Sequence, residues 1–428
     1  MLLGDGGVAW RAASVRLGRS CGDTVRLVGH PAEAAASFRA EVRDWLDRHV
    51  GPYRVDLTAD SASLVFADVS DSAYVDRGKA WQRLLHDAGW AGLGWPVEHG
   101  GRGASMAERV IWAQESAAAG APPGINLLAE GIVGPTLMAH GDEQQQRRYL
   151  PPMLTGEEIW CQLFSEPDAG SDIAAVRTTA VRDGDGWRVD GHKTWTSAAH
   201  YADFGVLLAR TDWDAPKHRG STYFVVDLHA PGVTTRPLRQ MTGGAAFNEV
   251  LLDGVPVPDP ARVGDVGEGW SVARTTLWHE RLNLGLGLTR VGGGVGRVLD
   301  RFAASPMASD PVVRQTAAQL WIESRCLGYL GERALAALAE GGAPGPEGSV
   351  AKLASARVSR RCDELLDASR GAGATVWDDD TLVQLWIPAT SIAGGTDEVL
   401  RSVLAERVLG LPRSWPSDGD VPFRDVAH

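Results

Sequence analysis

The spacing of apolar residues changes twice along this 428-residue chain, and these two changes constrain the fold more than any other feature. Residues 31–158 show helical spacing, whereas residues 159–265 contain short β-branched and aromatic runs separated by turn signals such as Asp183 to Gly186. Residues 266–412 return to long helical patterns. The sequence therefore predicts an α+β protein with an N-terminal α-helical domain, a central β-barrel or sandwich and a C-terminal four-helix bundle.

Apolar stripes and breaking residues set the helices expected on either side of the β segment. The first begins at Pro31 and ends by Gly51, because glycine and the following proline interrupt a helix. Asp142 is a candidate N-cap for a later helix. The remaining helices are expected at about 76–88, 106–119, 127–140, 143–154, 271–305, 311–340, 347–369 and 396–409.

The ends and the composition exclude several classes of protein. Residues 1–30 are predicted to be a disordered extension and residues 413–428 a tail without structure. No apolar run reaches the roughly eighteen residues of a membrane span, and no signal peptide is evident. The four cysteines form no CxxC pair, which favours a cytoplasmic location and neither a metal site nor a secreted scaffold. A net charge of −12 argues against a nucleic-acid partner.

Two motifs inside the β segment are candidates for ligand binding. The first, F-S-E-P-D-A-G-S-D at 164–172, is a strand that breaks into a turn of small residues, where backbone N–H groups and hydroxyls can approach a polar ligand. The second is H-K-T-W-T-S at 192–197. Its alternation places Trp195 and Ser197 on one face of a strand and Thr196 on the other. Either motif alone is typical of an ordinary hairpin, but the pair suits a flat heteroaromatic ring.

Together the motifs resemble the flavin-binding signature of the acyl-CoA dehydrogenases, and the resemblance covers about residues 31–412. It implies bound FAD, with Ser165 at the redox-active edge of the ring and Ser171 near the pyrophosphate. Asp168 departs from the family, which more often has glycine there. The cofactor contacts implied by the resemblance are Gln162, Phe164, Ser165, Gly170, Ser171, Trp195, Thr196, Ser197, Thr396 and Glu398.

The position of the catalytic base is the largest departure from the family. Its members commonly carry a glutamate at the start of the last bundle helix, where this sequence reads S-I-A-G-G-T-D-E-V and has Gly394. A subgroup instead uses a Glu-Arg pair on the first bundle helix, and this chain has Glu280 followed by Arg281 in W-H-E-R-L. The resemblance therefore implies Glu280 as the base.

A Glu-Arg pair in a helix ordinarily lies on a solvated face. Here Leu277, Trp278 and Leu282 crowd the same helix, which favours burial of Glu280 and a raised pKa suited to proton abstraction. Asp397 and Glu398 are competing carboxylates, although acidic residues are expected in the first turn of any helix.

Several further contacts are expected from the resemblance. Substrate contacts are expected from Ser171, Arg281, Gly394 and Gly395, with a backbone N–H near the two glycines polarising the thioester carbonyl. The small side chains there could admit a branched or broad substrate. The glycines between 285 and 296 indicate close packing, a ligand channel or a broken helix. The usual adenine-binding motifs are absent, which leaves Arg314, Gln315 and Arg370 as candidates.

The function implied by the resemblance is FAD-dependent α,β-dehydrogenation of an acyl thioester to the 2,3-enoyl thioester. The acyl group would be carried by CoA or by an acyl carrier protein, the electrons would pass to an electron-transfer flavoprotein, and the chain would form a homodimer or homotetramer. Two alternatives stay open. One is a flavin monooxygenase or nitroalkane-oxidase-like enzyme of the same fold, and the other is a non-catalytic, flavin-holding subunit of a heteromer.

Overall fold

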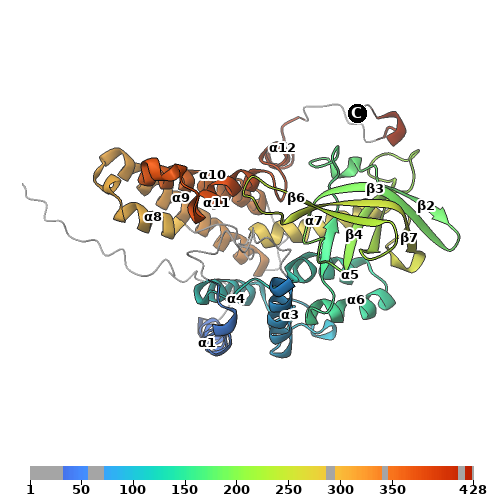
Figure 1. Ribbon diagram of the computed structural model, residues 1–428, viewed down its shortest axis with the longest axis horizontal. Coiled ribbons are helices and arrows are strands. Elements are labelled where there is room, and N and C mark those ends of the chain that lie inside the picture. The colour runs from blue at the N-terminus through green and yellow to red at the C-terminus, as the bar shows by residue number, and fades with distance from the viewer. Residues whose placement is uncertain (1–31, 56–71, 286–294, 340–345, 413–419, 427–428) are drawn as a thin grey trace, which may run out of the picture.

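The computed structural model describes residues 32–55, 72–285, 295–339, 346–412 and 420–426. The extension predicted at 1–30 and most of the glycine-rich run after residue 285 lie outside the described residues. Figure 1 shows N-terminal helices at the bottom, a sheet on the right and C-terminal helices at the upper left. The predicted fold class is confirmed, with helical domains before and after a central β domain.

Amphipathic helices build the N-terminal domain. In α1 (Ala32–His49), Val42 and Leu46 lie four residues apart and are fully buried, as their helical spacing predicts. Asp142 caps its helix through a capping box with Gln145, in which each side chain bonds the other residue's backbone N–H. The other helices of this domain are α3 (Ser72–Asp87), α4 (Met106–Ala119), α5 (Gly134–His140) and α6 (Glu143–Thr155).

A π-helical turn interrupts the helix expected over residues 127–140. It spans Ala129–Val133 and leads directly into α5. Gly134 makes room for Trp95, because a Cβ at this glycine would lie 2.0 Å from the indole ring. The Trp95 indole N–H in turn donates to the Glu130 carbonyl at 2.7 Å. The π turn therefore depends on packing with another segment, which the local sequence does not reveal.

The central strands form one hydrogen-bonded sheet with the order β6-β7-β3-β2-β4-β5-β8, while β1 leaves this path and pairs in parallel with β4. β4 and β5 are buried along nearly their whole length on both faces, and α7 packs against both strands. The strands are β1 (Trp160–Leu163), β2 (Thr179–Asp183), β3 (Gly186–Ser197), β4 (Phe204–Arg210), β5 (Ser221–Asp227), β6 (Val233–Leu238), β7 (Phe247–Pro258) and β8 (Arg262–Val263).

The C-terminal helices have a hydrophobic core of their own, which includes Phe302, Leu320 and Leu365. A short helix, α11, was not predicted, although Asp378 caps it through its carboxylate. None of the helices in the described ranges is long and apolar enough to span a bilayer. The helices of this domain are α7 (Gly269–Gly285), α8 (Val295–Ala304), α9 (Pro311–Ala339), α10 (Glu347–Arg370), α11 (Asp379–Trp386) and α12 (Asp397–Arg407).

The prediction of an unstructured C-terminal tail is wrong for residues 420–426. Phe423 is fully buried against Trp213, with ring centroids 5.4 Å apart, and the Arg210 guanidinium lies 3.9 Å from the centre of its ring. Arg424 also pairs with Asp214 at 2.5 Å. A single aromatic anchor thus fixes this segment on the β domain, and such an anchor has no periodicity that a sequence pattern could detect.

A buried ion pair links the sheet to the turn that follows β1. The fully buried Lys193 ammonium donates to the Glu166 carboxylate at 2.7 Å and to the carbonyls of Phe164 and Leu208. Burial alone would raise the pKa of Glu166, but the Lys193 charge and hydrogen bonds from residues 177 and 178 lower it below its usual range. This stabilisation is therefore present above about pH 4.5 and is lost as the pH falls through the lowered pKa.

We expect Lys193→Met to lower the free energy of unfolding by about 3–5 kcal/mol, because it leaves the Glu166 carboxylate buried without its counter-ion. Urea unfolding followed by circular dichroism measures this change. The double variant Lys193→Met/Glu166→Gln should lose less than the sum of the two single variants, because both remove the same interaction.

The exposed pair between Arg48 and Asp44 on α1 provides a matched control. Arg48→Met should change the free energy of unfolding by about 0.5 kcal/mol or less. If Lys193→Met were no more destabilising than this control, the buried pair would not have the structural role assigned to it.

Candidate active site

A cavity of about 2320 Å³ lies where the three parts of the chain meet. It brings together β1, the turn after it, β3, α7 and the segment before α12, which are far apart in the sequence. Apart from the three candidates for the adenine half, all but two of the predicted site residues line it. Those that do are Gln162, Phe164, Ser165, Gly170, Ser171, Trp195, Ser197, Glu280, Arg281, Gly394, Gly395 and Thr396.

The two exceptions are Thr196 and Glu398. The Thr196 side chain is buried away from the cavity, and its backbone carbonyl accepts a hydrogen bond from the Asn248 amide at 3.1 Å. The Glu398 side chain is exposed on α12 and lies 3.6 Å from Arg401. Side-chain contacts of these two residues with a ligand in this cavity are therefore not supported.

The first motif forms a tight turn that is closed by backbone hydrogen bonds. Glu166 and Ala169 exchange two backbone hydrogen bonds of 3.0 and 3.1 Å, so Pro167 and Asp168 occupy the tip. Asp168 is exposed and has no positive φ, so the turn does not require glycine at this position. Gly170 faces open space, because no heavy atom lies within 4 Å of where its Cβ would be.

The second motif contains a β-bulge between Lys193 and Thr196. Trp195 has a φ of +56°, which is rare for an aromatic residue, and its side chain is 60% exposed along the cavity wall. Trp195 and Ser197 do share the cavity side, as the alternation predicts. The two motifs are joined by a 2.9 Å hydrogen bond from the Thr194 N–H to the Ser165 carbonyl.

These residues fit the flavin ring that the motifs suggest. Trp195 offers a flat aromatic surface, and the loop at Gly170 leaves room for a bulky group. Ser165 and Ser171 add hydroxyl groups on the same wall, which suit the polar edge of the ring and a phosphate. The candidates for the adenine half lie elsewhere. Arg314 and Gln315 are exposed at the start of α9, and Arg370 is engaged with Asp378 at 2.7 Å.

Three polar contacts fix α7 against its neighbours. Thr276 lies within 3.1 Å of the Thr136 hydroxyl and 3.0 Å of the Tyr223 hydroxyl, which connects α7 to both α5 and β5. Asn283 donates to the Gly131 carbonyl in the π turn at 2.7 Å. Glu280 lies between these two residues on the same face of the helix, so it is held at the cavity by contacts on either side.

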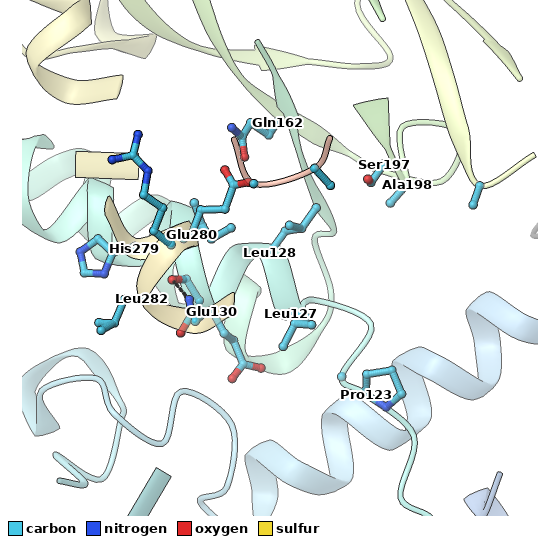
Figure 2. A pocket seen from close by; sticks show the side chains of 18 of the residues that line it. Pro123, Leu127, Leu128, Glu130, Gln162, Ser197, Ala198, His279, Glu280 and Leu282 are labelled. Carbon is cyan, nitrogen blue, oxygen red and sulfur yellow. Dashed lines mark hydrogen bonds between the residues drawn. The ribbon is translucent and has the colours of Figure 1, made fainter. Parts of the chain in front are cut away.

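Glu280 reaches the cavity opposite β1. Figure 2 shows its carboxylate pointing toward Gln162, while Ser197 and Ala198 line the wall farther along. Burial raises the pKa of Glu280, and the Gln162 hydrogen bond and the positive charge of Arg281 partly oppose this rise. A carboxylate with a raised pKa is a stronger base than an exposed one, so this environment suits proton abstraction near neutral pH.

The competing carboxylates are placed less favourably. Asp397 is buried but pairs with Lys352 at 3.1 Å and with Arg360 at 3.5 Å, outside the cavity lining. Gly394 has a φ of +67°, a conformation that residues with side chains rarely adopt. Neither position presents a free carboxylate to the cavity.

Sequence reasoning missed another carboxylate in the wall, Glu130 of the π turn. Its carboxylate accepts hydrogen bonds from the Gln82 amide and from the Gly92 N–H, the latter at 2.6 Å. Burial raises its pKa, and both hydrogen bonds lower it. Figure 2 places Glu130 and Glu280 on the same side of the cavity. Glu130 reaches the cavity lining from a π turn, which no sequence pattern had predicted.

The chain resembles known proteins along most of its length. Three acyl-CoA dehydrogenase domain families match it in order, the N-terminal domain at 32–157, the middle domain at 161–255 and the C-terminal domain at 267–409. It is 41% identical over 386 residues to the acyl-CoA dehydrogenase IpdE1 of Mycobacterium tuberculosis, covering 88% of this chain and 97% of that protein.

Two further proteins are similar. The acyl-CoA dehydrogenase FadE34 of Mycobacterium tuberculosis is 44% identical over 333 residues, which are 78% of this chain but 46% of that protein, so this chain spans about half its length. A solved structure described as the Tcur3481-Tcur3483 steroid ACAD superposes with a TM-score of 0.78 at 29% identity, covering 90% of this chain and 99% of that one. The chain therefore belongs to the acyl-CoA dehydrogenase family and is, like its members, a FAD-dependent oxidoreductase.

Proposed function

We propose that this enzyme oxidises the Cα–Cβ bond of an acyl-CoA thioester and that Glu280 removes the Cα proton. Bound FAD supplies the hydride acceptor. The observation that carries the proposal is the position of Glu280, a carboxylate in the cavity wall with a raised pKa and no paired cation within 4 Å among the described residues. Arg281 opposes the rise in pKa and keeps the carboxylate available as a base near neutral pH.

The segment before α12 would hold the thioester carbonyl. Gly394 and Gly395 line the cavity with φ values of +67° and +90°, and without side chains their backbone would be open to a bound ligand. A backbone N–H from these glycines would stabilise the negative charge that develops on the carbonyl oxygen when the proton leaves. This contribution does not need a side chain at position 394.

We further propose that the acyl group is broad. The residues at 393–395, which line the same cavity as Glu280, have small side chains, and the lining also includes the indole rings of Trp90, Trp95 and Trp112. The similar steroid ACAD supports a ring-bearing acyl group. A panel of linear, branched and steroid side-chain CoA thioesters tests this proposal, and faster reaction of the short linear esters would contradict it.

Glu280→Gln should slow flavin reduction by about 100-fold or more, because it removes the general base and keeps the size of the side chain. The measurement is anaerobic stopped-flow absorbance of the flavin after mixing with an acyl-CoA. Electron-transfer flavoprotein added afterwards should be reduced by the wild type. Rapid reaction of the reduced enzyme with oxygen would instead favour an oxygen-using enzyme.

Glu130→Gln is the matched control, because Glu130 is another glutamate of the cavity lining and is already hydrogen-bonded by Gln82 and Gly92. We expect its rate of flavin reduction to stay within a few-fold of the wild type. A large loss in Glu130→Gln together with a normal rate in Glu280→Gln would reassign the base.

The rate of flavin reduction should fall as the pH drops through the raised pKa of Glu280, because only the carboxylate form accepts the proton. Arg281→Gln removes a charge that lowers this pKa, so it should move the midpoint to higher pH. Arg274→Gln, an exposed arginine on the same helix, should leave the midpoint unchanged. Identical profiles for the wild type and Arg281→Gln would contradict the proposed electrostatic role.

We propose that the enzyme is a homo-oligomer that uses α9 in its interface. Trp321, Ile322 and Tyr329 of this helix are 50%, 47% and 55% exposed, and large apolar side chains on one helix commonly mark a protein contact. Trp321→Glu/Tyr329→Glu should lower the mass measured by sedimentation, whereas Val97→Glu in the N-terminal domain should not. A wild type that sediments as a monomer would refute the proposal.

A further inference from the structure

Arg109 is a cationic side chain of the cavity wall that has no acidic partner among the residues the structure describes. Arg109 is on the face of α4 that borders the cavity, together with Met106, Ala113 and Ser116, which follow the helical spacing. Its guanidinium donates to the Asn283 side-chain oxygen at 3.1 Å. Among the described residues no carboxylate lies within 4 Å of it, and burial lowers its pKa without an opposing negative charge.

A buried charged residue of the same helix does have oppositely charged partners. Glu115, also on α4, is buried and pairs with both Arg39 and Arg43. Removing a charge from water costs free energy unless the charge is paired. An unpaired guanidinium in a cavity wall therefore indicates that a ligand supplies its hydrogen-bond acceptor. A guanidinium has five N–H donors, and Asn283 uses one of them.

The surroundings leave this guanidinium accessible from the cavity. A Cβ at Gly94 would lie 2.7 Å from the Arg109 Cδ, so the glycine makes room for the side chain. His279 lies close enough for the Arg109 charge to help burial lower its pKa to about 4, and a neutral imidazole provides no counter-ion. The nearest polar partner, Asn283, is held by the Gly131 carbonyl and cannot neutralise the charge.

The location relative to the base defines which part of a substrate would reach Arg109. Asn283 follows Glu280 by three residues on α7, which is about 5 Å along the helix axis. Its amide oxygen contacts Arg109. An acyl chain that has its Cα proton at Glu280 and extends along α7 toward Asn283 would pass Arg109 several bonds beyond the reacting carbons.

We propose that Arg109 binds an acceptor oxygen, a carboxylate or a ketone, on the distal part of the acyl group, and that it makes the enzyme selective for oxygenated acyl chains over plain alkyl chains. This inference rests on the proposed acyl-thioester oxidation and names the class of substrate for the same cavity. Hydrogen bonds to a half-buried guanidinium are charge-assisted, so the expected selectivity is about tenfold or more.

The test compares three CoA thioesters of equal chain length that end in a methyl group, a methyl ketone or a carboxylate, over several lengths. In the wild-type holoenzyme, kcat/KM should be at least about tenfold higher for an oxygenated ester than for the alkyl ester of the same length. In Arg109→Met this preference should disappear, and in Arg109→Lys it should be partly kept. The better of the two oxygenated esters identifies the natural acceptor.

Calorimetric binding of the matching CoA thioethers, which lack the thioester carbonyl, gives a readout that does not depend on turnover. Tighter binding of an oxygenated thioether to the wild type than to Arg109→Met supports the inference, whether or not any thioester is oxidised. If such binding is found and no thioester is oxidised, only the proposed function fails. If alkyl thioesters reduce the flavin and oxygenated ones neither bind nor react better, the inference is overturned. A preference that persists in Arg109→Met overturns it as well.

Discussion

The buried ion pair between Lys193 and Glu166 is the interaction on which the candidate site depends. It connects the turn after β1 to β3 and, through the Leu208 carbonyl, to β4. The cavity walls at Ser165 and Trp195 belong to these two segments, and a hydrogen bond from Thr194 to Ser165 completes the connection. A buried charge pair is costly to form but more costly to break, so it specifies one relative position of the two motifs.

The packing of helix α7 is the second constraint on the geometry of the candidate site. It packs against the sheet, the π turn and α10, and its hydroxyl and amide groups bond to partners in both other domains. This position places Glu280 opposite Gln162 and presents Asn283 to Arg109. One helix thus positions both the candidate base and the amide that contacts Arg109.

Much of the fold could be predicted because its local signals agree with the final structure. The stripe at Val42 and Leu46 and the cap at Asp142 form as their spacing predicts, since burial and capping follow from local geometry. The failures share a different cause. The π turn at Ala129–Val133, the anchor at Phe423 and the inward-facing Arg109 all depend on segments far away in the chain. Local patterns contain no information about such partners.

The sequence by itself determined the family resemblance, the order of the three domains and the two motifs of the cavity wall, because these depend on residue type and spacing. Only the tertiary structure decided which carboxylates face the cavity. Asp397 is paired with Lys352, Glu398 is exposed, and Glu280 is enclosed with a raised pKa. The physical reason is that burial and charge pairing are properties of the packed surroundings, and identical side chains acquire different chemistry there.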